Sequence, residues 1–172
     1  ADTASEMGAD VTLISTFKVG KGYKNIVTET AQEMERAVKE NLQSQDCVIM
    51  AAAVSDYRIK NYSEQKIKKS TEDEITLELV KNPDILKEIS GTSGVKIVGF
   101  CAESENLIEN AKKKIQNKGC DYLIANDISR KDIGFNSNQN EIYILNKNLN
   151  IKHIEKDSKQ NIAKRILEEI FE

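Results

Sequence analysis

The chain has 172 residues, the length of one domain, and a chain of this size buries about 70% of its unfolded surface on folding. Hydrophobic residues make up 39% and charged residues 31%, and no apolar run approaches the roughly 18 residues of a membrane-spanning helix. With 25 basic and 28 acidic side chains, the net charge is −3. This composition excludes a membrane protein and argues against a nucleic-acid-binding protein.

The N-terminal elements are expected to be the end of a helix, two strands, a helix and a third strand, over residues 1–7, 10–15, 25–28, 30–44 and 47–54. Thr30 and Glu33 have the spacing of a capping box that begins the helix. The third strand, CVIMAAAV, is a continuous apolar run without alternation. Such a run is typical of a parallel strand that is covered on both faces.

The remaining elements follow a polar stretch over residues 57–65. A strand over residues 75–79 comes first, and a helix that begins near Asn82 follows it. Next come a strand over 96–102, a helix over 105–118 closed by Gly119, and a strand over 121–125. The last elements are a hairpin over 140–145 and 151–154 and a helix over 159–171. Buried strands that alternate with helices predict an α/β domain with a largely parallel sheet, followed by a C-terminal β-hairpin and helix.

The three cysteines and the single histidine give little sign of metal or nucleophilic chemistry. Cys47, Cys101 and Cys120 are separated by 54 and 19 residues, which matches no zinc-binding pattern. We expect reduced, buried thiols in a cytoplasmic protein. Because no nucleophile stands near His153, histidine catalysis is not expected.

Polar residues follow three of the predicted strands, at Ser55–Tyr57, Ala102–Ser104 and Asn126–Asp127. Ligands bind beyond the carboxyl ends of strands in open α/β sheets, although the same residues are ordinary helix caps. Asp56 has the chemistry to accept ribose hydroxyls, hold a metal or cap a turn. Phe100 is either a core residue or, near a strand end, a neighbour of a nucleotide base.

Residues 82–86 (NPDIL) have the pattern of a helix start, with Asn82 as N-cap and Pro83 at the first helical position. The free N–H groups of such a start also bind anions when the helix points into a cleft. The residues alone leave both interpretations open. The chain has neither GxxxxGK[ST] nor GxGxxG, so a nucleotide site would need another design.

Two groups of lysines are the other candidates. Residues 66–69 (KIKK) are either a solvated loop or a flap that closes on a polyphosphate. On the helix over residues 105–118, Lys114 and Lys118 share a stripe with Ala111, while Lys112 and Lys113 point elsewhere. Lys114 and Lys118 either extend along the apolar surface or reach into a cleft.

Taken together and in order, six segments resemble bacterial phosphopantothenate–cysteine ligase over nearly the whole chain. They are AAAVSDYR, EQKIKKS, LVKNPDIL, VGFCAES, DYLIANDIS and GFNSNQNEI, at residues 51–58, 64–70, 79–86, 98–104, 121–129 and 134–142. The resemblance implies a Rossmann-like three-layer fold and ligation of 4′-phosphopantothenate to L-cysteine with CTP and Mg²⁺, through an acyl-cytidylate. It also implies a homodimer, usually fused behind a flavin-dependent decarboxylase domain.

The resemblance also assigns roles to residues. Lys66 is implied to be the catalytic flap lysine, and Ala52 to allow close approach of the substrate. The implied CTP ligands are Asp56, Lys66, Pro83, Asp84, Ile85, Leu86, Phe100, Lys114 and Lys118. The metal ligands and the phosphopantothenate pocket are not assigned.

In the family, a first strand and a glycine-rich loop precede the segment that opens this chain. The resemblance therefore predicts one synthetase domain over residues 1–172 that lacks the first strand, the glycine-rich loop and the start of the first helix. Two alternatives remain open at this point: an ATP-using version of the ligase, and a nucleotide-binding module without catalysis, in which the lysines only solubilise the chain.

Overall fold

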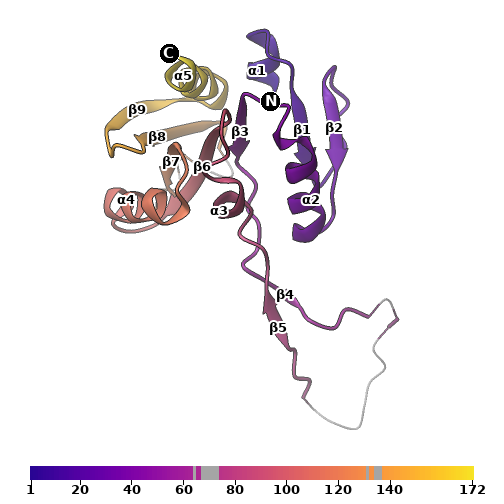
Figure 1. The fold of residues 1–172 in the computed structure, drawn as a ribbon. Coiled ribbons are helices and arrows are strands. Elements are labelled where there is room, and N and C mark those ends of the chain that lie inside the picture. The colour runs from indigo at the N-terminus through magenta and orange to yellow at the C-terminus, as the bar shows by residue number, and fades with distance from the viewer. Residues whose placement is uncertain (64, 67–73, 131, 134–136) are drawn as a thin grey trace.

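The computed structural model describes residues 1–63, 65–66, 74–130, 132–133 and 137–172. Its strands are β1 (Thr12–Ser15), β2 (Lys24–Val27), β3 (Cys47–Met50), β4 (Tyr57–Ile59), β5 (Leu79–Lys81), β6 (Lys96–Glu103), β7 (Tyr122–Asp127), β8 (Gln139–Asn146) and β9 (Ile151–Ser158). Its helices are α1 (Asp2–Glu6), α2 (Ala31–Leu42), α3 (Ile85–Ile89), α4 (Leu107–Lys118) and α5 (Lys159–Phe171). Figure 1 shows their arrangement.

The main sheet has five strands in the order β3-β6-β7-β8-β9. β3, β6 and β7 are parallel, whereas β8 and β9 are joined antiparallel as the predicted hairpin. β1 and β2 form a separate two-stranded parallel sheet. The α/β prediction with a mostly parallel sheet and a C-terminal hairpin and helix is therefore confirmed.

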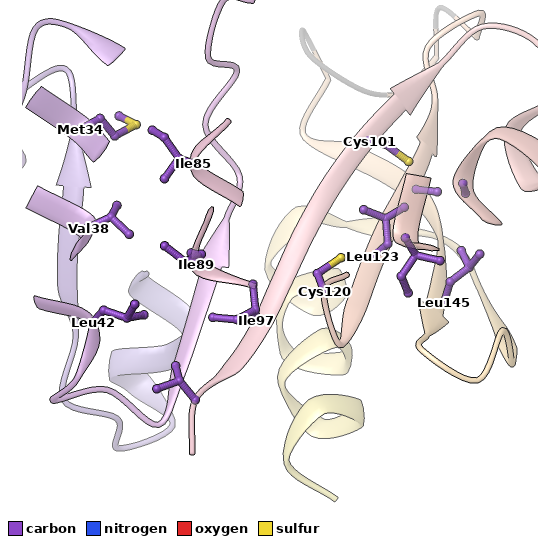
Figure 2. Packing of buried hydrophobic residues seen from close by; sticks show 14 residues of the cluster. Met34, Val38, Leu42, Ile85, Ile89, Ile97, Cys101, Cys120, Leu123 and Leu145 are labelled. Atoms are coloured by element: carbon purple, nitrogen blue, oxygen red, sulfur yellow. The ribbon is translucent and has the colours of Figure 1, made fainter. Parts of the chain in front are cut away.

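Helices cover both faces of the main sheet because side chains alternate along its strands. In β6, Ile97 and Cys101 belong to a core cluster that includes residues of α2, α3 and α4, while Val98 belongs to a second cluster closed by α5. Figure 2 shows the first cluster, in which Met34 and Val38 of α2 face α3. The result is the three-layer arrangement of a Rossmann-like fold.

Local sequence signals explain the helices that bound these layers. Thr30 and Glu33 form the predicted capping box at the start of α2. Ser158 caps α5, and the side chain of Lys96 donates a hydrogen bond to the Ile170 carbonyl near its end. The Lys96 ammonium also lies 5.2 Å from the centre of the Phe171 ring, so it stabilises the carboxyl end of the helix.

The arm, which we define as β4, β5 and the described residues between them (60–63, 65–66 and 74–78), extends away from the main sheet and the β1–β2 sheet (Figure 1). The sequence predicts a strand at 75–79, whereas β5 lies at 79–81 and pairs with β4, which was expected to be irregular. The strand predicted over 47–54 ends at Met50. Residues 51–53, expected to be buried, are exposed because the chain leaves the sheet there to enter the arm.

β1 and β3 both line a cavity of about 1090 Å³, which we call the interstrand cavity. In the described part of the chain, β1 pairs only with β2, and β3 pairs only with β6. The edges of two parallel strand pairs thus face one hollow, which residues of α2 also line.

Two of the three cysteines lie in the buried environment that the sequence predicts. Cys101 and Cys120 are buried and Cys47 is half-buried, and all three are free thiols. Burial raises the pKa of Cys47 and of Cys101 to about 11, so these thiols are protonated at neutral pH. None of the helices in the described residues is long and apolar enough to cross a membrane.

Replacing Gly99 by alanine is expected to lower the free energy of unfolding by about 1–3 kcal/mol, the usual cost of overpacking a core. A Cβ atom on Gly99 would lie 2.6 Å from Cδ2 of Leu86 and 3.1 Å from Cδ1 of Leu123. Chemical denaturation measures the change. Gly20→Ala is the control, since a Cβ there meets nothing within 4 Å. Equal midpoints for the two variants would contradict the expectation.

Candidate functional site

The start of α3 differs from its prediction. The helix begins at Ile85 with Asp84 as N-cap, and the Asp84 carboxylate accepts a hydrogen bond of 3.2 Å from the Lys87 amide. Asn82 is therefore not the N-cap. Of the three consecutive residues Asn82, Pro83 and Asp84, the last one caps the helix. Ile85 is buried and Leu86 packs on the core, so only their backbone groups are left to contact a ligand.

Asp84 also joins α3 to α4. Its carboxylate lies 2.5 Å from Lys118 Nζ, and the two side chains are 42% and 27% exposed. Burial raises the pKa of Asp84, but hydrogen bonds from Lys118 and the Lys87 amide outweigh burial and hold the pKa below its usual value. Asp84 is thus ionised at neutral pH, and the pair holds a positive and a negative group at the edge of the core.

Lys114 lies one turn before Lys118 on the same side of α4. Its Nζ is 3.9 Å from the Glu103 carboxylate, at the end of β6, and Asn110 donates a hydrogen bond of 3.2 Å to the same carboxylate. Lys113 is exposed. Lys114 and Lys118 thus lie on one side of α4, as their spacing predicts, and contact Glu103 of β6 and Asp84 before α3.

Asp56 lies at the base of the arm, where residues 81 and 82 form hydrogen bonds with residues 55–58. The backbone N–H of Asn82 donates to the Asp56 carbonyl at 2.8 Å, and its side chain donates to the Ser55 carbonyl at 2.8 Å. Arg58 donates to the Lys81 carbonyl at 2.5 Å and to Asn82 Oδ1 at 3.3 Å. Sequence reasoning missed Arg58 and this use of Asn82, although the R of DYR and the N of KNPDIL lie inside quoted segments.

Ala52 is exposed and lines the interstrand cavity, together with Asn82 and Arg58. The cavity therefore reaches from the ends of β1 and β3 to the base of the arm. A small side chain at position 52 leaves the backbone accessible from the hollow. This placement agrees with close approach of a ligand at Ala52, which stays a prediction.

Two predicted residues lie apart from the Asp84–Lys118 pair. Lys66 is exposed and belongs to the arm, which leads away from α3 and α4 (Figure 1). Among the contacts of the described residues, none joins Lys66 to the pair. The other three residues of KIKK, at 67–69, lie outside the described residues. Phe100 packs with the second core cluster, on the face of the sheet that α5 covers.

The described residues hold no group of three or more His, Cys, Asp and Glu side chains arranged as metal ligands. His153, the single histidine, lies on β9 of the hairpin and contacts residues of β8. Its Nε2 lies 3.1 Å from a Glu141 oxygen, and its ring stacks on Tyr143 with the centroids 4.5 Å apart. This contact explains the histidine structurally.

The layers and the charged groups after β3, β5 and β6 define a Rossmann-like α/β domain whose candidate ligand groups lie at the base of the arm, at the start of α3 and on α4. Residues 1–172 match the family described as the DNA/pantothenate metabolism flavoprotein C-terminal domain. The chain belongs to this family, which confirms the resemblance found in its sequence.

Coenzyme A biosynthesis bifunctional protein CoaBC of Borreliella burgdorferi is 36% identical over 178 residues, which cover 99% of this chain and 44% of the relative. The chain thus spans less than half of that protein. A crystal structure of the C-terminal domain of a CoaBC protein matches with a TM-score of 0.79 at 28% identity, over 99% of this chain and 77% of that one. A Cab2 mutant in complex with phosphopantothenate-cysteine shares the fold, with a TM-score of 0.64 at 15% identity over 86% and 52% of the two chains.

Proposed function

We propose that this chain is the synthetase part of an enzyme of coenzyme A biosynthesis that joins 4′-phosphopantothenate to L-cysteine with CTP. The contact of 2.5 Å between Asp84 and Lys118 carries the proposal. It unites two segments, 34 positions apart, that the family resemblance separately implies as nucleotide ligands. The names of the relatives, which are coenzyme A biosynthesis proteins, support the same activity.

The proposed reaction has two steps. A carboxylate oxygen of phosphopantothenate attacks the α-phosphorus of CTP, and the bond to pyrophosphate breaks, giving an acyl-cytidylate. The cysteine amine then attacks the acyl carbon, CMP leaves with the electron pair of the C–O bond, and the amine loses a proton. In both steps negative charge moves onto phosphate oxygens, where positively charged side chains stabilise it.

Residues from different elements of the chain would bind the nucleotide and stabilise this negative charge. Lys114 and Lys118 present ammonium groups from α4, and residues 83–86 present the start of α3. Asp56 would accept hydrogen bonds from ribose. Phe100 lies on the face of the sheet that α5 covers, opposite α3 and α4, so it would line the nucleotide pocket only where that pocket passes around the carboxyl end of β6. Lys66 would come from the arm to steady the transferring phosphate, which requires the arm to close or to act on another copy of the chain.

Mg²⁺ would accompany the nucleotide. The ion keeps much of its water and binds substrate phosphates together with one or two carboxylates, so it needs no cluster formed by the protein alone. Glu103 and Asp84, each next to a predicted nucleotide-binding lysine, have the oxygen chemistry it prefers. The Mg²⁺ would offset the charge of the triphosphate.

Free thiols with raised pKa values agree with a cytoplasmic location.

Pyrophosphate release by the full-length protein tests the proposal. The assay contains 4′-phosphopantothenate and Mg²⁺, with CTP or ATP, and with or without cysteine. CTP-specific release that needs phosphopantothenate, with cysteine needed for CMP formation, is the expected result. Release with ATP alone would establish the ATP-using ligase instead. A folded protein that binds nucleotide but releases no pyrophosphate would be a binding module.

We also propose that a further strand, from a segment outside these 172 residues, lies between β1 and β3. Among the described residues β1 pairs only with β2 and β3 only with β6, so each has an edge at the interstrand cavity with no strand beside it. A strand between them would join the parallel pairs β1–β2 and β3–β6 into one sheet. A longer piece of the protein that includes the segment before residue 1 is expected to unfold at a higher temperature than the 172 residues alone. Equal melting temperatures would contradict the added strand.

The proposed homodimer is supported by the arm. Tyr57, Ile59 and Leu79 are 46–55% exposed, and Ile59 lies directly opposite Leu79 in the ladder. Leu77 and Ile75 continue the same alternation and are also exposed. A two-stranded ribbon is marginally stable alone, and an apolar face of this kind is covered when two copies pack symmetrically.

Substituting Ile59 by lysine is expected to reduce the molar mass of the full-length protein in light scattering, because a charge enters the middle of the apolar face of the arm. Glu78→Gln is the matched control: Glu78 pairs with Lys60 at 2.5 Å on the same ribbon, outside that alternation. An unchanged mass in Ile59→Lys would place the dimer interface elsewhere, for example on the hairpin of β8 and β9.

A further inference from the structure

Asn82 connects the end of the β3 segment to the start of α3. Its Nδ2 donates to the Ser55 carbonyl and its backbone N–H donates to the Asp56 carbonyl, both at 2.8 Å. Its Oδ1 accepts a hydrogen bond of 3.3 Å from Arg58, which also donates to the Lys81 carbonyl. One half-buried amide side chain thus binds two segments that lie 27 positions apart.

The backbone bond of Asn82 is not specific to asparagine, but its two side-chain bonds are. The β4–β5 ladder ends with Tyr57 opposite Lys81, and the bond from the Asn82 N–H to the Asp56 carbonyl adds one more rung. The side chain reaches past that rung, to Ser55, where no further backbone pairing is formed in the described residues. An asparagine amide carries its donor and its acceptor on two separate atoms of one short side chain, so it can donate to a carbonyl on one side and accept from a guanidinium on the other.

Each of the two segments that Asn82 joins contains a proposed nucleotide ligand. Asp56 follows Ser55 directly, and Asp84 comes two positions after Asn82, where it caps α3 and pairs with Lys118. Residues 51–56 are outside any strand, so the hydrogen bonds of Asn82 restrict the position of Asp56 relative to the Asp84–Lys118 pair.

We propose that Asn82 is a positioning residue of the nucleotide site: it fixes the Ser55–Asp56 segment against the start of α3, so that both face the same ligand. This inference rests on the proposed function. Asn82 acts through Asp56 and the start of α3 and needs no contact with the nucleotide.

Two substitutions separate this role from the general stability of the arm. Asn82→Ala removes both side-chain bonds. Asn82→Asp keeps the size and the acceptor for Arg58 but places a carboxylate oxygen against the Ser55 carbonyl, so the donated bond is lost. Both are expected to weaken CTP binding by about tenfold or more, since loss of a partner for a half-buried group costs roughly one such factor. Glu78→Gln, which breaks an exposed ion pair on the same arm, is the control.

Calorimetric titration of the full-length protein with Mg²⁺ and CTP gives the affinity, and hydrogen exchange of residues 51–56 without nucleotide gives the local order. The expected result is faster exchange of this segment and weaker binding in both Asn82 variants, with the unfolding midpoint close to that of the unsubstituted protein and of Glu78→Gln. A role confined to stability would move the midpoint instead.

The outcomes separate this inference from the proposed function. If the unsubstituted protein binds neither CTP nor ATP, the proposed function fails and the inference fails with it. If it binds CTP and the Asn82 variants bind equally well, the positioning role is wrong while the proposed function stands. Unchanged exchange of residues 51–56 in Asn82→Asp would also overturn the role, because the bond to Ser55 would then fix nothing.

Discussion

Replacement of Lys66 by alanine is expected to reduce turnover of phosphopantothenate and CTP by a factor of about 100 to 1000, the usual effect of removing one donor that stabilises transition-state charge. Lys66 is exposed on the arm, so its loss is expected to leave the core, the main sheet and the β1–β2 sheet unchanged. Steady-state release of pyrophosphate by the full-length protein measures the effect, and circular dichroism verifies the fold.

Lys60→Ala is the control for this result, because Lys60 is another exposed lysine of the arm whose partner is Glu78. The two variants lose the same charge from the same part of the molecule. If both reduce turnover slightly and equally, Lys66 belongs to a solvated loop and the catalytic assignment is wrong.

Replacement of Lys118 by alanine is expected to weaken CTP binding by about 10- to 100-fold, the range for loss of a charge-assisted hydrogen bond. The unpaired Asp84 carboxylate that remains adds repulsion for the phosphates. Since both side chains are partly exposed, the effect on the free energy of unfolding is expected to be below about 1 kcal/mol. Titration calorimetry with Mg²⁺ and CTP measures the affinity.

Lys113→Ala is the matched control on α4, since Lys113 is exposed and lies on another side of the helix. General attraction between a lysine-rich helix and a polyphosphate would make the two variants equal. A loss of CTP affinity in Lys118→Ala but not in Lys113→Ala would show that the nucleotide binds on the side of α4 that carries Lys118. Equal affinities in Lys118→Ala and the unsubstituted protein would remove α4 from the nucleotide site.

Elements with a local signal could be predicted from the sequence. The capping box of Thr30 and Glu33 specifies the start of α2, and α5 has the predicted bounds, 159–171. Gly119 ends α4 with a φ of 71°, a conformation that glycine adopts without strain. At the starts of α2 and α5 and at the end of α4, the deciding interactions lie within one helical turn, so the sequence alone is enough to predict them.

Elements that depend on distant partners could not be predicted. β4 has three residues and exists only because residues 79–81 pair with it. The alanines after Met50 are as apolar as a buried strand, yet they leave the sheet. The separation of β1 and β2 from the main sheet likewise depends on strand pairing across the chain, which no local pattern encodes.

The candidate site divides in the same way. Helical spacing alone places Lys114 and Lys118 together, and the structure gives them Glu103 and Asp84 as partners. The role of Asn82 could not be predicted, because a side chain that resembles a local helix cap binds a carbonyl 27 positions earlier. The roles of Asp56, Lys66 and Phe100 in nucleotide binding stay predictions.

The arm is inserted between two neighbouring strands of the main sheet, since β3 ends at Met50 and its partner β6 begins at Lys96. Pairing these strands closes a loop formed by residues 51–95, and the entropic cost of closing a flexible loop rises only with the logarithm of its length. Doubling such a loop costs about 0.6 kcal/mol. The arm can therefore lengthen, shorten or exchange its tip in evolution while the sheet that supports it keeps nearly the same stability.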